Sequence, residues 1–198
     1  MTRVAAIDCG TNSIRLLVAD GHIGEDGRPH LADLTRQMRI VRLGQGVDAR
    51  GYLDPAAISR AVEATVEYQR MIEKLGATSI RFVATSATRD ASNSAEFVRQ
   101  IKAVIGVEPE VVVGTQEASL SFRGAVGGLG EPLPGPMLVV DIGGGSTELV
   151  LGSTSVKQAI SIDMGAVRVT EKFFTHVDPA GGVPAADQER AIAWIDEQ

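Results

Sequence analysis

Two acidic residues flank a glycine-rich turn in the second half of the chain. Asp141 ends a β-branched run, Gly143–Gly145 follow, and Ser146, Thr147 and Glu148 lead into another apolar run. Consecutive glycines can take positive φ angles, so we expect their backbone N–H groups to converge on one point. Donors for a phosphate beside acids for a divalent cation are the groups that phosphoryl chemistry uses. The simpler alternative is a hairpin with a glycine-rich turn and incidental acids.

The same pattern occurs near the N-terminus, which favours the chemical interpretation. Both copies read an apolar strand, then Asp-x-Gly-x-x-Ser, then a second apolar strand. The alignment pairs Asp8 with Asp141, Gly10 with Gly143, and Ser13 with Ser146. Internal repetition predicts two like domains that face each other across a cleft.

Two further segments place polar groups at the ends of predicted elements. A strand over residues 79–84 runs into several hydroxyls and Arg89, and open α/β sheets bind ligands at this end of their strands. A solvated turn explains that segment equally well. Glu117 stands in the first turn of a predicted helix, where its charge suits the helix dipole. From the sequence alone, this structural role is favoured over a catalytic one.

The predicted elements give an α/β protein. We expect strands over residues 3–9, 14–20, 31–43, 79–84 and 108–114. A long helix is expected between Asp54 and Gly76, and a second helix starts at a capping box, Asn93–Glu96. Residues 1–130 thus form one domain of order βββαβαβα, and residues 124–136 contain a helix end and a linker. Residues 131–198 form a partial second domain of order βββα with one further helix. Because a missing half-sheet would expose apolar surface and a strand edge, we expect a longer protein.

Composition excludes several classes of function. The chain has 198 residues, 44% of them hydrophobic, and a net charge of −6, which argues against broad nucleic-acid binding through a basic surface. No apolar run is long enough for a membrane helix, and the N-terminus lacks a signal-peptide pattern. The single cysteine, Cys9, excludes an intramolecular disulfide and fits the cytoplasm. Its place at a strand end favours packing over nucleophilic catalysis.

The duplicated unit resembles the ribonuclease H-like (actin-like ATPase) domains of the actin, sugar kinase and 70-kDa heat-shock superfamily. Within it, five segments resemble the exopolyphosphatase and guanosine pentaphosphate phosphohydrolase family, and the chain is most similar to its short, two-domain actinobacterial type. The segments are Ala6–Ser13, Ala84–Arg89, Gly114–Ala118, Val140–Glu148 and Met164–Arg168. They follow one another over nearly the whole chain, so together they are far more specific than any one of them.

The resemblance implies a role for each matching residue. Glu117 would be the catalytic base that polarises a water for attack on a terminal phosphorus. The substrate-binding residues would be Asn12, Ser13, Arg89, Gly143, Gly144, Gly145, Ser146 and Thr147. Mg²⁺ would be held by Asp141 and Glu148, with Asp8 as a third acid. The implied partners are inorganic polyphosphate or guanosine pentaphosphate, together with a second copy of the chain in a homodimer.

Two departures from the family pattern bear on this prediction. Many relatives carry a second acid just before the catalytic one and an arginine two residues after it, where this chain has Gln116 and Ser119. Either change could retune activity or chain binding. The leading hypothesis is an exopolyphosphatase, and the close alternative is a guanosine pentaphosphate 5′-phosphohydrolase. Two other classes are a catalytically weak polyphosphate- or alarmone-binding protein and an ATP-binding kinase or chaperone ATPase.

Overall fold

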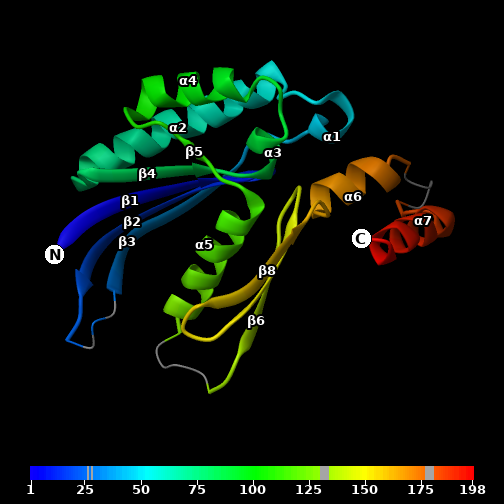
Figure 1. Cartoon of the computed structure of the whole chain (residues 1–198). Coiled ribbons are helices and arrows are strands. Elements are labelled where there is room, and N and C mark those ends of the chain that lie inside the picture. Colours follow the sequence, from blue (N-terminus) through cyan, green and yellow to red (C-terminus); the bar gives the residue numbers. More distant parts are fainter. Residues whose placement is uncertain (26, 28, 130–133, 177–180) are drawn as a thin grey trace. The chain divides into compact units, whose positions relative to one another are not determined.

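The computed structural model describes all residues except 26, 28, 130–133 and 177–180. The chain divides into two compact units, Met1–Val113 and Gly114–Gln198, and each contains one β-sheet (Figure 1). Within the described residues, no helix is both long and apolar enough to cross a membrane.

The first unit is a mixed sheet with helices on one face. Its elements are β1 (Thr2–Cys9), β2 (Ser13–Ile23), β3 (Pro29–Ile40), α1 (Val47–Arg50), α2 (Pro55–Leu75), β4 (Ser79–Ala84), α3 (Ser86–Arg89), α4 (Ser94–Ile105) and β5 (Glu110–Val111). The strand order is β3-β2-β1-β4-β5, in which β1 pairs antiparallel with β2 and parallel with β4. The predicted α/β class and the order of the first seven elements are confirmed, with two four-residue helices added.

The sequence predicts both α2 and α4. The capping signals of α2 are confirmed, whereas the predicted cap of α4 is not formed. The Asp54 side chain caps α2 by accepting the Ala56 N–H at 2.9 Å, and Gly76 ends the helix at φ 73°. Asn93 precedes α4 but makes no side-chain cap bond. Its amide group instead accepts the N–H of Leu53 at 2.8 Å and donates to the Leu53 carbonyl at 3.0 Å. The predicted capping box is therefore a tether between two segments of the unit.

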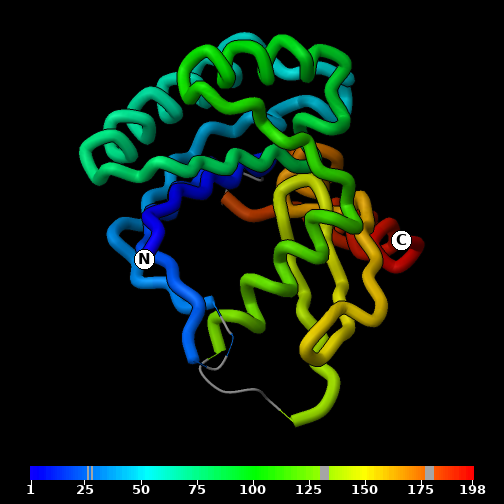
Figure 2. The backbone as a smooth tube through the Cα atoms, turned by 60° about the vertical axis from the view of Figure 1, so that its left-hand side comes forward, coloured from blue at the N-terminus to red at the C-terminus, as the bar shows by residue number. Residues whose placement is uncertain are grey.

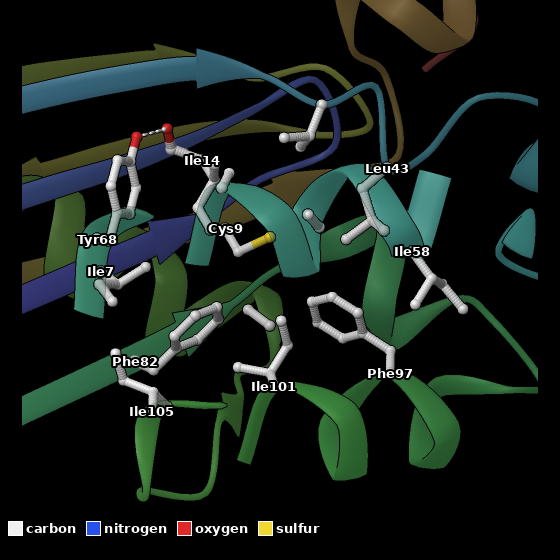
Figure 3. Packing of buried hydrophobic residues seen from close by; sticks show 14 of the residues in the cluster. Ile7, Cys9, Ile14, Leu43, Ile58, Tyr68, Phe82, Phe97, Ile101 and Ile105 are labelled. Atoms are coloured by element: carbon white, nitrogen blue, oxygen red, sulfur yellow. Dashed lines mark hydrogen bonds between the residues drawn. The ribbon is translucent and has the colours of Figure 1, made fainter. Parts of the chain in front are cut away.

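The main hydrophobic core lies between this sheet and the pair α2 and α4. Figure 3 shows Phe82 of the sheet beside Phe97 and Ile101 of α4, all fully buried. The Tyr68 hydroxyl donates to the Ile14 carbonyl at 2.9 Å, which gives this buried polar group its partner. Cys9 belongs to the same cluster at 1% exposure, so its predicted packing role is confirmed.

The Cys9 thiol is expected to be inert in the folded protein. Burial, and secondarily the charge of Asp8, raise the pKa of this thiol far above its ordinary value of 9.0, so it stays protonated near neutral pH. The unfolded chain loses that proton above about pH 9 while the folded chain keeps it, so this contribution to stability falls as pH rises through that range. Iodoacetamide at pH 8 should label Cys9 only after denaturation. Rapid labelling of the native protein would contradict this packing.

The second unit is a three-stranded antiparallel meander with one helix packed on it. Its elements are α5 (Gly114–Gly127), β6 (Met137–Ile142), β7 (Thr147–Gly152), β8 (Val156–Ile162), α6 (Ala166–Phe173) and α7 (Ala185–Asp196). Ala118 and Phe122 of α5 pack against Val150 of β7, and Figure 2 shows α5 alongside the three strands. The compact units thus meet between Val113 and Gly114, whereas the predicted first domain ends at residue 130 and includes this helix. Of the predicted helix end and linker over residues 124–136, residues 130–133 lie outside the described residues.

One face of the second sheet carries apolar side chains without a helical cover among the described residues. Leu138, Val140 and Ile142 of β6 are 62%, 51% and 70% exposed. Under the repeat alignment they correspond to Ala5, Ile7 and Cys9 of β1, which α2 and α4 bury to 1–2%. The expected exposed apolar surface of a partial second domain is therefore present.

Candidate functional site

The two Asp-x-Gly-x-x-Ser turns have the same backbone geometry. The Gly10 N–H donates to the Ser13 carbonyl at 3.0 Å, and the Gly143 N–H donates to the Ser146 carbonyl at 2.9 Å. Each turn joins two antiparallel strands, β1 to β2 in the first unit and β6 to β7 in the second. The predicted internal repeat is confirmed at the level of individual hydrogen bonds.

The residue opposite the aspartate differs between the two turns. Asp8 lies opposite Arg15, whose guanidinium is 3.3 Å from its carboxylate. Asp141 lies opposite Glu148, which is only 1% exposed. Side chains directly opposite each other on neighbouring strands share one face of the sheet, and like charges there repel. The first turn therefore balances its own charge, whereas the second concentrates two carboxylates.

Two serines hold these carboxylates in a row across the second sheet. Glu148 lies opposite Ser161 of β8, so Asp141, Glu148 and Ser161 are neighbours on three adjacent strands. The Ser161 hydroxyl donates to Glu148 at 2.8 Å, and the Ser121 hydroxyl of α5 donates to Asp141 at 2.6 Å. The α5 helix therefore covers the face that carries both acids.

Glu117 lies on the face of α5 that is directed at this row. Gly114, three residues before it, is pressed so closely on β8 that a Cβ atom there would lie 2.5 Å from the Ser161 hydroxyl oxygen. Ser121, four residues after it, contacts Asp141. Residues three and four apart on a helix share one face, so Glu117 is placed between the two contacts. Glu117 is half-buried and stands in the first turn of the helix, as predicted.

The glycine turn uses its glycines differently from the prediction. None of Gly143, Gly144 and Gly145 has a positive φ, so the positive φ angles expected of this turn are absent. The turn instead presents carbonyl groups to the start of α6. Gly143 accepts the Ala166 N–H at 2.9 Å, and Gly144 accepts the Val167 and Arg168 N–H groups at 2.8 and 3.1 Å. These bonds satisfy N–H groups that a helix start leaves without partners.

Side chains complete the junction between the turn and α6. The Thr147 hydroxyl donates to the Met164 carbonyl, and Arg168 Nε donates to the Gly145 carbonyl at 2.9 Å. Ser146 is buried at 1% exposure. The Thr147 hydroxyl is thus engaged within the fold, whereas Arg168 brings a guanidinium group to the turn.

The predicted ligands of the first unit lie on connected segments. Asn12 is exposed in the turn, and its carbonyl accepts the Val41 and Arg42 N–H groups, while Ser13 starts β2 half-buried. Arg89 ends α3 and donates to the Val112 carbonyl at 3.0 Å. A buried hydroxyl pair links the turn to α3, with 2.8 Å between Thr11 Oγ1 and Ser86 Oγ. The turn and the helix that carries Arg89 are therefore parts of one connected framework.

The two acids of the second unit suit a divalent cation of the magnesium type. Mg²⁺ in phosphoryl-transfer sites is held by one or two carboxylates, with water and substrate phosphate as its other ligands. Asp141 and Glu148 supply two carboxylates on one face of a sheet, which fits this donor set. Within the described residues, no three acidic, histidine or cysteine side chains form a metal-binding group. Asp8 belongs to the first unit, opposite Arg15, and its role as a third ligand stays a prediction.

Sequence reasoning missed two serines and one arginine contact. Ser121 could have been found from its position four residues after Glu117, on the same helix face. Ser161 becomes visible only through the register between β7 and β8. Arg168 lies in a matched segment, but no sequence feature indicates that its guanidinium contacts Gly145.

Comparison with known proteins finds related sequences over most of the chain. Residues 22–193 match the model of the Ppx/GppA phosphatase family. Exopolyphosphatase 2 of Mycobacterium tuberculosis is 50% identical over 184 residues, which is 90% of this chain and 57% of that protein. A bifunctional 3-dehydroquinate synthase/phosphatase of Fusobacterium nucleatum is 34% identical over 86% of this chain and 26% of its own length. The chain thus spans little more than half of the M. tuberculosis relative.

Solved structures agree with the fold. An exopolyphosphatase from Cytophaga hutchinsonii aligns with a TM-score of 0.86 at 28% identity, over 99% of this chain and 60% of that one. The Aquifex aeolicus member of the Ppx/GppA family aligns with a TM-score of 0.74 at 32% identity, over 99% of this chain and 61% of that one. A type IV pilus PilM–PilN complex, at 13% identity and a TM-score of 0.51, shares the fold alone.

Proposed function

Because the chain belongs to the Ppx/GppA phosphatase family, we propose that it hydrolyses a terminal phosphoanhydride bond, with inorganic polyphosphate as its substrate. Water attacks the terminal phosphorus, the bond to the bridging oxygen breaks, and orthophosphate leaves. The shortened chain keeps the bridging oxygen as an anionic end group. Such a reaction needs an oriented water and neutralisation of phosphate charge more than covalent catalysis.

The observation that carries this proposal is the position of Glu117 over a face that holds two further carboxylates. Glu117 on α5 can accept a proton from the attacking water, while Ser121 ties the same helix to Asp141. All of these groups belong to one compact unit. In this proposal the glycine turn between β6 and β7, to which Arg168 of α6 is bonded at Gly145, binds phosphate oxygens. Asn12, Ser13 and Arg89 of the first unit are the other proposed phosphate ligands.

The substrate class follows from what the related proteins are called and from charge. Relatives named exopolyphosphatase match most of this chain at 50% and 28% identity. Polyphosphate presents a uniform row of anionic oxygens, which backbone N–H groups and arginines can bind without reading a base. Guanosine pentaphosphate carries the same terminal anhydride and is the alternative that the experiment must separate.

Asp141 and Glu148 are the proposed magnesium ligands. When bound, Mg²⁺ would neutralise charge on the transferred phosphate and its leaving oxygen. We expect Asp141→Asn to raise the Mg²⁺ concentration for half-maximal rate by at least about 10-fold to 100-fold, because altering even an outer-shell partner of a metal ligand costs about that much in affinity. Asp163→Asn, at an exposed position in the same unit, is the matched control and should leave the curve unchanged. Identical magnesium curves for the Asp141 variant and the wild type would refute the assignment.

The proposed function is tested by measuring phosphate release by the complete gene product. Three substrates are supplied at equal concentrations of terminal phosphoanhydride groups. Polyphosphate, guanosine pentaphosphate and ATP are compared in the presence of Mg²⁺. Fastest release from polyphosphate is expected, and a clear preference for guanosine pentaphosphate would move the assignment to the alternative. Binding of polyphosphate without release would identify a binding protein, and release from ATP alone would point to an ATPase.

A cytoplasmic location and a homodimer are also part of this proposal. A single, fully buried cysteine suits the reducing cytoplasm, where polyphosphate and alarmones would be accessible to the enzyme. A homodimer stays a prediction, which sedimentation of the complete gene product would check.

A further inference from the structure

The row of side chains that carries the two acids of the second sheet differs from the matching row of the first sheet. On β8 this row ends in Ser161, opposite Glu148. In the first sheet the same places on the three strands hold Asp8, Arg15 and Met38. Both rows use the same strand pairing, so the fold itself does not require a serine there. The serine occurs where two carboxylates, rather than an acid and an arginine, lie opposite each other.

A serine hydroxyl bonds each of these two carboxylates. Ser121 donates to Asp141 Oδ2 at 2.6 Å, and Ser161 donates to Glu148 Oε1 at 2.8 Å. Within the described part of the chain, the two carboxylates accept no other hydrogen bond and form no ion pair. A hydroxyl donor fixes the orientation of a carboxylate but leaves its negative charge intact. The second sheet therefore keeps two oriented negative charges side by side.

The same two serines also contact α5 on either side of Glu117. Ser121 belongs to the helix and follows Glu117 by four residues. Ser161 lies against Gly114, three residues before Glu117, where an added Cβ atom would be 2.5 Å from the serine oxygen and 2.6 Å from the serine Cβ atom. The position of the helix and the orientation of the acids therefore depend on the same contacts.

We infer that Ser121 and Ser161 are positioning residues, which orient Asp141 and Glu148 for the cation and hold α5 against them. The inference rests on the proposed function and deepens it. Groups that bond a metal ligand orient it, and removal of such a partner typically lowers metal affinity by about 10-fold to 100-fold. Each serine occupies one oxygen of its carboxylate, so this arrangement leaves Asp141 Oδ1 and Glu148 Oε2 for the cation.

A purely structural role of the serines predicts a different result for the same substitutions. If the serines only fasten α5 to the sheet, their removal lowers the stability of the unit and leaves its metal affinity unchanged. If they orient the acids, metal affinity falls even where stability is kept. Ser121→Ala separates the two cases well, because alanine favours a helix more than serine does and so offsets part of the lost hydrogen bond.

The test measures Mn²⁺ binding to the complete gene product without substrate, from the electron paramagnetic resonance signal of free Mn²⁺, and Mg²⁺ binding by competition. The variants are Ser121→Ala, Ser161→Ala and Ser121→Thr, the last of which keeps a hydroxyl group. The matched control is Ser155→Ala, at an exposed position just before β8 in the same unit. Urea unfolding without metal records the stability of each variant.

We expect Ser121→Ala and Ser161→Ala each to weaken Mn²⁺ binding by about 10-fold or more, Ser121→Thr to recover part of the loss, and the control to match the wild type. Unchanged or tighter binding in either alanine variant, with the wild type binding the ion, would overturn this inference and leave the proposed function standing. A wild type that binds no Mn²⁺ would overturn the inference together with the magnesium assignment. A wild type that binds the ion but does not hydrolyse polyphosphate would overturn the proposed function alone.

Discussion

Glu117→Gln is expected to lower kcat for polyphosphate by about 10²-fold to 10⁴-fold, with little change in KM. Glutamine has nearly the shape of glutamate but cannot accept the proton of the attacking water. The contacts that position this part of α5, from Gly114 to Ser161 and from Ser121 to Asp141, do not involve the substituted group. The folded structure should therefore persist, and the loss should appear in the chemical step.

The matched control for this variant is Glu189→Gln, the same substitution at an exposed position in α7. It should leave kcat, KM and the unfolding midpoint unchanged. Circular dichroism and thermal unfolding of the Glu117 variant should overlay those of the wild type. A variant that is folded like the wild type and turns over polyphosphate at an equal rate would remove Glu117 from the role of base.

Gly165→Ala is expected to destabilise the second unit strongly. A Cβ atom at this position would lie 2.4 Å from both the carbon and the oxygen of the Gly144 carbonyl and 2.6 Å from the Gly145 nitrogen. These are backbone atoms, so the clash cannot be relieved by a side-chain rotation. Either the turn or the start of α6 must move, which would break the hydrogen bonds that Gly143 and Gly144 accept. Overpacking of this kind costs about 1–3 kcal/mol, and more where backbone must shift.

The control for this prediction is the same substitution at Gly124, with the opposite expected sign. Gly124 lies within α5, has no positive φ, and has nothing within 4 Å of an added Cβ atom. Gly124→Ala should therefore stabilise the unit by about 0.5–1 kcal/mol through the better helix propensity of alanine. Urea unfolding of both variants gives the comparison. Equal unfolding midpoints for Gly165→Ala and the wild type would mean that α6 does not dock on the turn as described.

The sequence predicts well those features that depend on residues close together in the chain. Asp54 and Gly76 mark both ends of α2 by chemistry that acts within one helical turn. The Asp-x-Gly-x-x-Ser pattern predicts two equivalent hairpins because the hydrogen bond that closes each turn joins residues three apart, Gly143 and Ser146 in the second. Alternation and β-branching then predict the flanking strands.

The features that the sequence does not predict depend on what packs against a segment. Asn93 has the sequence of a helix cap, yet Leu53, forty residues earlier, supplies a better pair of hydrogen-bonding groups. The glycines of the second turn suggest positive φ, which none of them adopts, and the close approach of Gly165 to the Gly144 and Gly145 backbone has no signal in the sequence. The predicted strand over 108–114 shrinks to the two residues of β5, since Gly114 already starts α5.

The site also has a part that the sequence predicts and a part that depends on packing. Glu117, Asp141 and Glu148 could be named from motifs, but their arrangement on one unit could not, because chain order alone groups α5 with the strands before it. The packing of Ala118 and Phe122 on Val150 shows that α5 lies against the second sheet. The predicted roles of these acids rest on family resemblance, and their common face is the observation that the structure adds.

The measurement that tests the central claim most directly is a time course of polyphosphate degradation by the complete gene product, with orthophosphate and remaining chain lengths followed together. Wild type with Mg²⁺ should release orthophosphate from the first minutes while the chains shorten from their ends, and Glu117→Gln should show neither change on that timescale. Orthophosphate released equally fast by the Glu117 variant, or chains cut internally without orthophosphate, would contradict a terminal hydrolysis in which Glu117 activates the water.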